Sequence, residues 1–334
     1  MCTVLLVAFT SQPARCNDLC GDSMPTPSVS VFALVYGQSG LGKSTDMAAT
    51  FPNALFVARP GGMQSAQSFL GIEVAEAHVR TLEEVINLIA FAKQRGHDAI
   101  VVDDLSLLAE STERDLDAAM EAEGNRNKFA KYNTLNGLAA SLREQGRYVG
   151  IHFAANAHER IAGTDAKGAS RNGGPKLPSW NMGDSIVHEA SLVLRVAKDA
   201  QRAQQWQTVY DCQYESIWTG KDRLTATAPR SPHNLRAILT AGGYTMSRAP
   251  GLEWQDEVTL AVAQKAADGQ GTADIVALLW PKLVGSAGLD PRHVAWAVRD
   301  GLATAELTAA TANRFKSLFD FIPPTPAISA VFGS

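Results

Sequence analysis

The clearest chemical signature in the chain is a glycine-rich loop between an apolar run and a predicted helix. The loop reads Gly37-Gln38-Ser39-Gly40-Leu41-Gly42-Lys43-Ser44-Thr45, which is the pattern G-x-x-x-x-G-K-[ST]. Glycines let successive backbone N–H groups turn inward around a phosphate, and the helix behind them adds partial positive charge. Lys43 can reach the β- and γ-phosphates, and the Ser44 hydroxyl can bind Mg²⁺. The loop therefore predicts a site for ATP with Mg²⁺; a glycine-rich turn that matches by chance is the alternative.

A pair of carboxylates forms the second signature, at the end of an apolar run. Ile100-Val101-Val102 is followed directly by Asp103 and Asp104, which is the form of a Walker B strand. Ligands collect at the carboxyl ends of strands in open α/β sheets, so we expect Asp103 to hold Mg²⁺, directly or through water. Asp104 is then a candidate to orient or deprotonate the attacking water. A strand that ends in a solvated acidic turn would have the same sequence.

Further polar residues could complete this site. His158, with Asn156, comes after the next apolar strand, where a P-loop ATPase places a polar sensor of the γ-phosphate; a packing role is equally open. Lys221 and Arg223 lie two residues apart at the end of a β segment, so they project to the same side. They form either a solvated turn or a pair of fingers that reach into a neighbouring subunit's site. The second interpretation predicts a homo-oligomer with ATP between subunits.

The elements that must position these residues alternate between strands and helices. This order predicts an α/β fold with a mostly parallel sheet and helices on both faces. Thr81 and Glu84 have the spacing of a capping box, which predicts a helix from there to Gly96. A further helix is expected from about 126 to 145. Strands are expected at 31–36, 54–58, 99–102 and 148–155, and an antiparallel edge extension at 191–196, 206–210 and 215–219.

Two later regions differ in character from this core. Residues 161–183 are rich in Gly, Asn, Pro and cations, which predicts a long mobile loop of functional importance. From about 250 onward the pattern is helical, with expected helices at 253–267, 272–283, 291–301 and 311–321. We interpret this region as a small helical domain for a protein partner or oligomerisation, or as a lid on the core. The expected division is a leader at 1–23, an ATPase domain at 24–248 and a helical domain at 249–334.

Composition limits the class of protein. The 334 residues carry a net charge of −4, so any contact with nucleic acid must come from a local basic patch. No apolar run is long enough for a membrane span, and we expect no membrane partner. Cys2, Cys16, Cys20 and Cys212 show no metal-site or disulfide pattern, which favours reduced thiols and a cytoplasmic protein. Residues 1–23 lack the basic start of a secretory signal, so we favour an upstream start-site extension over a cleaved signal.

The ordered set of motifs resembles the RecA-like ATPase superfamily, which includes recombinases and hexameric replicative helicases. More closely, residues 30 to about 245 resemble small phage-encoded RecA-like nucleotide-binding proteins of single-strand annealing and recombination. The motifs are GQSGLGKST (37–45), AIVVDDLSLL (99–108), AANAHER (154–160), GGPKLP (173–178) and WTGKDR (218–223). The resemblance implies a RecA-type core, ATP hydrolysis with Mg²⁺, ring or filament assembly, single-stranded DNA as a partner, and location in a host cytoplasm.

One departure from this family affects the chemistry. RecA-type recombinases carry a catalytic glutamate just after the second strand, where this chain has Ala58-Arg59-Pro60. Either Asp104 takes over the activation of water, or hydrolysis is slow and ATP acts more as a conformational switch.

The resemblance places contact with single-stranded DNA on the 161–183 loop. Lys167, Arg171 and Lys176, with Arg160 at the entrance, make this segment locally basic, and Trp180 could stack on a base. An ordinary surface loop is the alternative. Three functions follow as hypotheses: an ATP-dependent recombination or annealing protein, a hexameric helicase-type DNA motor, or an ATP-regulated adaptor without direct DNA binding.

Overall fold

The computed structural model describes most of the chain between residues 30 and 319. The described residues are 30–125, 127, 129–164, 170–171, 173–198, 212–215, 230–232, 234–244, 246–249 and 251–319. The predicted leader, the predicted strand at 206–210 and the residues Lys167, Lys221 and Arg223 lie outside them. Within the described part, no helix is both long and apolar enough to cross a membrane.

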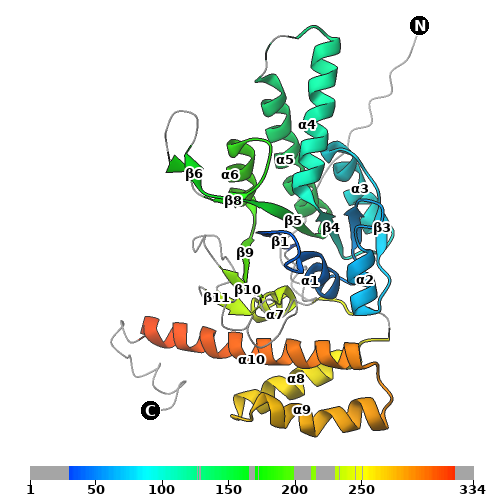
Figure 1. Cartoon of the computed structure of the whole chain (residues 1–334), viewed down its shortest axis with the longest axis vertical. Coiled ribbons are helices and arrows are strands. Elements are labelled where there is room, and N and C mark those ends of the chain that lie inside the picture. The colour runs from blue at the N-terminus through cyan, green and yellow to red at the C-terminus, as the bar shows by residue number, and fades with distance from the viewer. Residues whose placement is uncertain are drawn as a thin grey trace, which may run out of the picture.

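A nine-stranded, mostly parallel sheet forms the centre of the molecule (Figure 1). Its parallel part has the order β9-β1-β5-β4-β2-β3, so β5 lies between the strand that precedes the glycine-rich loop and the strand that ends in Asp103. The bounds are β1 Phe32–Gly37, β2 Leu55–Ala58, β3 Ala75–Ala77, β4 Ala99–Asp103, β5 His152–Arg160 and β9 Leu192–Lys198. The predicted mostly parallel sheet is confirmed.

The antiparallel extension expected at 191–196, 206–210 and 215–219 is only partly as predicted. The strand at 191–196 is β9, which pairs parallel with β1, and residues 216–219 lie outside the described part. β10 (Cys212–Glu215) pairs antiparallel with β9, and β11 (Arg230–Pro232) pairs antiparallel with β10. Within the predicted loop, β8 (Gly174–Pro175) pairs antiparallel with the last residues of β5. The short strands β6 (Gly163–Thr164) and β7 (Ser170–Arg171) pair with each other in a separate hairpin.

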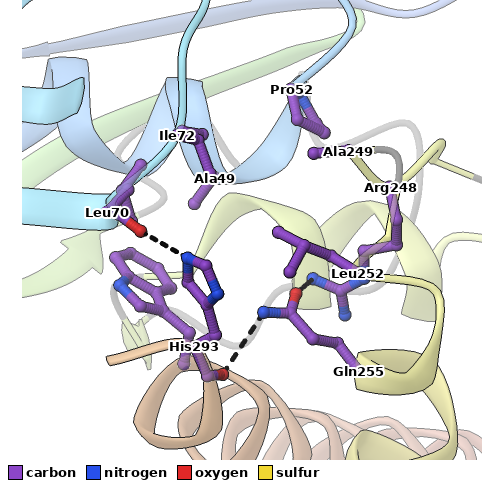
Figure 2. A pocket seen from close by; sticks show the side chains of 10 residues that line it. Ala49, Pro52, Leu70, Ile72, Arg248, Ala249, Leu252, Gln255 and His293 are labelled. Atoms are coloured by element: carbon purple, nitrogen blue, oxygen red, sulfur yellow. Dashed lines mark hydrogen bonds between the residues drawn. The ribbon is translucent and has the colours of Figure 1, made fainter. Parts of the chain in front are cut away.

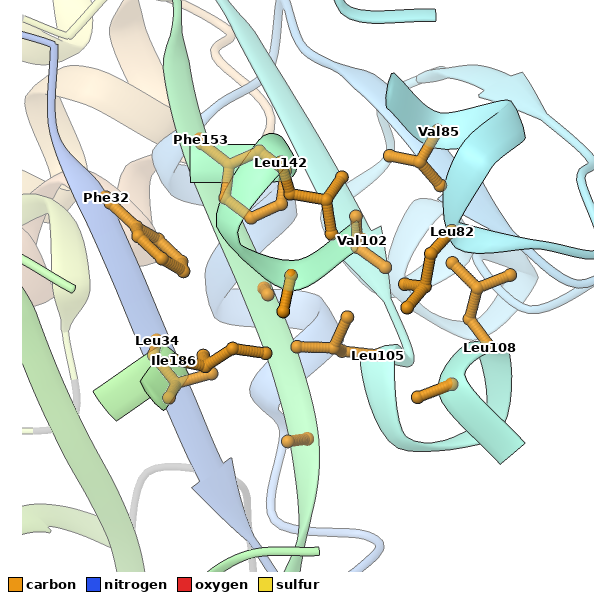
Figure 3. Packing of buried hydrophobic residues seen from close by; sticks show 14 of the residues in the cluster. Phe32, Leu34, Leu82, Val85, Val102, Leu105, Leu108, Leu142, Phe153 and Ile186 are labelled. Atoms are coloured by element: carbon orange, nitrogen blue, oxygen red, sulfur yellow. The ribbon is translucent and has the colours of Figure 1, made fainter. Parts of the chain in front are cut away.

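Helices cover both faces of the sheet because successive residues of each central strand point to opposite sides. In β1, Ala33 and Val35 face a core shared with α1, α2 and α7. Phe32, Leu34 and Tyr36 face the other core, which is shared with α3 to α6 (Figure 3). The bounds are α1 Lys43–Thr50, α2 Gln64–Leu70, α3 Leu82–Gln94, α4 Leu105–Ala122, α5 Ala130–Val149, α6 Trp180–Glu189 and α7 Leu235–Ala241.

Helix α3 begins as the sequence predicts. The Thr81 hydroxyl accepts a hydrogen bond from the Glu84 backbone N–H at 3.3 Å, and the Glu84 carboxylate accepts from the Thr81 N–H, also at 3.3 Å. This reciprocal pair is a complete capping box. The helix ends before Gly96, which has a φ of 83°.

The region between 104 and 190 departs from the predictions in three places. Helix α4 was not expected, and the next helix covers 130–149 rather than 126–145. Residues 148 and 149 therefore belong to α5, and the strand begins only at His152, after Gly150 turns the chain with a φ of 68°. The predicted loop at 161–183 contains three short strands and the first turn of α6, which Ser179 caps by accepting from the Met182 N–H at 3.1 Å.

The C-terminal region is helical, as predicted, with a small core of its own. Val262, Ile275, Val294 and Ala297 are its most buried members. The bounds are α8 Trp254–Ala267, α9 Thr272–Trp280, a π-helical turn Pro281–Ser286 and α10 Pro291–Phe319.

The two helices expected at 291–301 and 311–321 form one continuous helix, α10, so that prediction is wrong. Gly301 does not end a helix but lies where α10 crosses α8. A Cβ atom at Gly301 would lie 2.5 Å from the Val262 Cβ and 2.6 Å from the Thr259 carbonyl oxygen. Glycine is therefore needed at this crossing for close contact between two helices, and not for a turn.

Candidate nucleotide-binding site

The glycine-rich loop connects β1 to α1 as the sequence predicts. Gly40 and Gly42 both have a φ of 78°, the left-handed conformation that glycine adopts without strain. The Lys43 ammonium turns back into the loop and donates to the carbonyl oxygens of Gly37 at 3.1 Å and Gln38 at 2.8 Å. Lys43 is only 8% exposed, so its charge lies inside the concave side of the loop, where phosphate oxygens could replace the carbonyls.

Asp103 lies next to this loop because the parallel strands end at the same edge of the sheet. Its carboxylate interacts with the Ser44 hydroxyl and with the side chain of Asn156. Burial raises the pKa of Asp103 above its ordinary value, and the nearby Asp104 charge adds to the rise. The Ser44 hydroxyl and the Asn156 amide, which both lie close to the carboxylate, and the charge of Lys43 act in the opposite direction and lower this pKa. A buried carboxylate of this kind gains from a bound cation.

Asn156 completes this group from the strand between β1 and β4. It pairs in register with Val35, and it is fully buried. Its amide lies close enough to Asp103 to lower that pKa, but within the described chain neither amide atom makes a hydrogen bond of good geometry. Buried amides normally have partners, so Asn156 is suited to receive a polar ligand atom.

The donor set fits Mg²⁺ bound together with phosphates. Ser44 and Asp103 offer a hydroxyl and a carboxylate oxygen, the hard ligands that this ion prefers. No group of three or more His, Cys, Asp or Glu residues that could hold a metal occurs in the described residues. A site with few protein ligands agrees with the way Mg²⁺ keeps waters and substrate phosphates as its other ligands.

Asp104 and His158 contact each other, but both are engaged in the fold. One Asp104 carboxylate oxygen, Oδ1, caps α4 by accepting from the backbone N–H groups of Ser106 at 2.6 Å and Leu107 at 3.2 Å. Its other oxygen, Oδ2, lies 3.1 Å from His158 Nε2. His158 lies within β5, not after it as expected, because β8 extends the pairing of that strand. The contact between Asp104 and His158 therefore joins β5 to the start of α4.

The carboxyl end of β2 carries no acidic side chain beside Asp103. Ala58 is in register with Asp103, and Arg59 and Pro60 follow it. A cavity of about 290 Å³ opens at this point, between the ends of β2, β3 and β4. His78, which no sequence pattern indicated, lines this cavity together with Asp103 and Asp104. It follows a strand of three residues, too short to be recognised from a pattern.

The residues predicted to contact DNA are only partly described. Arg171 lies in β7, opposite Gly163, and Trp180 is the first residue of α6 rather than part of a loop. The Lys176 ammonium lies 3.1 Å from the Glu110 carboxylate of α4, and both side chains are exposed.

Helix α10 of the C-terminal region contacts α1, the helix that follows the glycine-rich loop. The Asp46 carboxylate of α1 accepts from the Leu235 N–H of α7 at 2.9 Å and lies 3.3 Å from the Arg299 guanidinium of α10. Nearby, His293 Nε2 lies 2.7 Å from the Leu70 carbonyl oxygen, across a small pocket of about 30 Å³ (Figure 2). Helix α10 thus contributes to the same hydrophobic core as α1 and α2.

A family model described as an AAA domain, AAA_24, matches residues 31–224. The chain belongs to this AAA domain family. The match extends from β1 past the last strand of the parallel sheet, so it includes the glycine-rich loop, Asp103 and Asn156. Together with the loop geometry, the AAA domain identifies the protein as a nucleotide-binding ATPase of the P-loop superfamily.

Comparison with individual proteins gives no more specific assignment than this family. No curated protein matches the sequence. Among solved structures, a KaiC-like protein from the hyperthermophilic archaeon Pyrococcus horikoshii is similar, with a TM-score of 0.31 and 13% sequence identity. The alignment covers 50% of this chain and 72% of that one.

Proposed function

We propose that this protein hydrolyses ATP with Mg²⁺ and uses it to act on single-stranded DNA in recombination or annealing. The observation that carries the ATP part is the group formed by Lys43, Ser44, Asp103 and Asn156. A buried ammonium, a hydroxyl, a carboxylate and an amide without a good partner come together at the carboxyl ends of three neighbouring strands. Few ligands other than a metal-bound polyphosphate would satisfy all four groups.

Each residue then has a defined task. The loop N–H groups and the Lys43 ammonium bind the phosphate chain, and Ser44 and Asp103 would hold Mg²⁺, which neutralises charge on the β- and γ-phosphates. The Asn156 amide donates to a γ-phosphate oxygen or to a water beside it. The contact between Asp104 and His158 joins the start of α4 to β5 beside this site.

The DNA part rests on the resemblance to annealing and recombination proteins and on the cations of the 161–183 segment. Binding of labelled single-stranded DNA across a salt series, with and without ATP, tests it. Lys167→Ala/Arg171→Ala/Lys176→Ala should weaken binding, and the slope of log affinity against log salt should fall by up to about 2, at about 0.7 per lost phosphate contact. A control, Arg95→Ala/Lys265→Ala/Lys282→Ala, removes the same charge elsewhere and should bind normally. Equal binding by both triple variants, or no effect of ATP, would contradict the DNA proposal.

The assembly part rests on Lys221 and Arg223 as fingers that act on a neighbouring subunit's ATP. If so, Arg223→Ala should bind ATP without hydrolysing it, because the charge that builds on the phosphate is no longer neutralised. Mixing this variant with Lys43→Ala protein should restore part of the turnover, since mixed interfaces contain one intact site. Absence of restoration would assign Arg223 a role within its own subunit.

A further inference from the structure

The cavity at the carboxyl end of β2 adjoins the proposed γ-phosphate site. Asp103 lines the cavity on one side and contacts Ser44 of the phosphate-binding loop on the other. With about 290 Å³ of space, the cavity can hold several waters. Because Asp103 borders both spaces, a water held in the cavity would lie next to the residue that we propose as a metal ligand.

Neither carboxylate of this cavity is available as a base. Asp103 is committed to the metal ion in the proposed function. Asp104 uses Oδ1 to cap α4 and Oδ2 to contact His158. No other Asp or Glu residue lines the cavity among the described residues. The group that activates water must therefore be sought among the other residues that line it.

His78 has the required free atom. Its Nδ1 lies 2.8 Å from the Ala58 carbonyl oxygen, at the end of β2 directly opposite Asp103. A carbonyl oxygen can only accept a hydrogen bond, so Nδ1 must carry a proton. In the neutral ring, Nε2 then carries the lone pair, and in the described residues no hydrogen bond to it is found. The contact with Ala58 thus fixes both the tautomer and the position of the ring.

We propose that His78 is the base that activates water for ATP hydrolysis, in place of the glutamate expected after β2. The water oxygen forms a bond to the γ-phosphorus while the bond from that phosphorus to the β,γ-bridging oxygen breaks, and its electron pair leaves with ADP. The water proton moves to His78 Nε2 and passes from there to solvent. This inference rests on the proposed ATP hydrolysis and names the residue that makes it possible.

Two substitutions separate proton transfer from structural support. His78→Asn retains an N–H that can donate to the Ala58 oxygen but has no basic nitrogen. His78→Ala leaves a space that imidazole from the buffer can enter. His97→Asn and His97→Ala are the matched controls, because His97 Nδ1 makes the same type of contact, 3.0 Å from the Asn53 carbonyl oxygen, at the opposite end of the strands.

The measurements are ATP affinity and kcat for each variant, with thermal unfolding as a test of folding. Both His78 variants should bind ATP like wild type, while kcat falls by about 10²–10⁴-fold, the usual contribution of a general base. Imidazole should restore part of the kcat of His78→Ala and leave His97→Ala unchanged. A wild-type kcat in both folded His78 variants would overturn the role of His78 while the ATPase stands. If His78→Asn and His78→Ala lose ATP affinity and kcat in parallel, with no rescue, the role is structural and the inference fails. If wild type neither binds nor hydrolyses ATP, the proposed function fails as well.

Discussion

The ionised Asp103 carboxylate destabilises the nucleotide-free protein because it is buried. Its pKa is raised by burial, so the folded chain holds the proton more tightly than the unfolded chain does. The ionised carboxylate therefore destabilises the fold, and this cost grows as pH rises from the unfolded value near 3.8 to above the folded value. A bound cation would offset the cost, which couples stability to the ligand.

The first prediction follows from the destabilising effect of the ionised Asp103 carboxylate. Asp103→Asn removes the charge and keeps the shape, so without nucleotide its Tm at pH 7 should exceed that of wild type by roughly 2 °C or more. The difference should shrink as the pH falls toward the ordinary value of 3.8, because protonation removes the charge from the wild-type carboxyl group. Addition of Mg²⁺ and ATP should raise the Tm of wild type more than that of the variant. A lower Tm for Asp103→Asn at pH 7 would contradict the prediction.

At this scale, local sequence identifies some residues of the site and not others. Lys43, Ser44 and Asp103 could be predicted because each follows directly from the strand or loop next to it. The engagement of Asp104 and His158 could not, since it joins α4 to β5 across the fold. His78 was missed for a similar reason, because only the pairing of β3 with β2 brings it to Ala58.

Two glycines in the helices of this protein should respond in opposite ways when they are replaced by alanine. Gly301 lies in the middle of α10 against Val262 and the Thr259 carbonyl, whereas a Cβ atom added at Gly137 of α5 would meet no atom within 4 Å. Replacing a helix-interior glycine by alanine normally stabilises by about 1 kcal/mol. Steric overlap of the new methyl group with backbone atoms that cannot move instead destabilises the protein.

The second prediction compares these two sites. Gly137→Ala should stabilise the protein by about 0.5–1 kcal/mol, the gain in helix propensity. Gly301→Ala should destabilise it by about 1–3 kcal/mol, because α8 and α10 must separate to make room for the new methyl group. Urea denaturation of both variants measures the difference. Stabilisation by Gly301→Ala would show that α8 and α10 do not cross closely at this residue.

Whether the sequence predicts a helix or strand depends on whether its signals are local. Capping residues and apolar spacing identified α3, and buried runs identified β1 and β4, because those signals are local. Helix α4 was missed because its buried residues all lie between 105 and 112, and its remaining residues are mostly charged or small. The division of α10 at Gly301 was wrong because helix crossing and helix ending favour the same residue.

At the scale of the whole molecule, the C-terminal helices and α1, the helix that follows the phosphate-binding loop, share one buried polar network. Asp46, three residues after Lys43, joins α1 to α7 and α10 through Leu235 and Arg299. Asp300 continues the network to Asn234 at 2.6 Å and to Arg248 at 3.3 Å. Helices α8 to α10 are therefore held against the core by charged groups as well as by apolar contacts. The sequence left open whether this region is a lid or a partner domain, since such long-range contacts have no local pattern.

The third prediction tests this network. Asp46→Asn keeps an acceptor for the Leu235 N–H but loses the charge that pairs with Arg299, so stability should fall by about 1–3 kcal/mol. Limited proteolysis should cleave before α8 more readily than in wild type, because the C-terminal helices are held less tightly. Asp268→Asn, at an exposed carboxylate after α8, is the control and should match wild type in both measurements. Unchanged stability and proteolysis of Asp46→Asn would show that this network does not hold the C-terminal helices.

The central claim is that the loop at 37–45 binds ATP through the buried Lys43 ammonium. Isothermal titration of Mg²⁺–ATP into wild type, Lys43→Ala and the control Lys93→Ala tests it most directly. Lys93 donates to the Gly150 carbonyl at 3.3 Å on the exposed side of α3, so its loss should leave ATP binding unchanged. Lys43→Ala should lose about 100-fold or more in affinity, since a desolvated charge contact with phosphate is removed. Equal ATP affinity in all three proteins, or no binding by wild type, would contradict the claim.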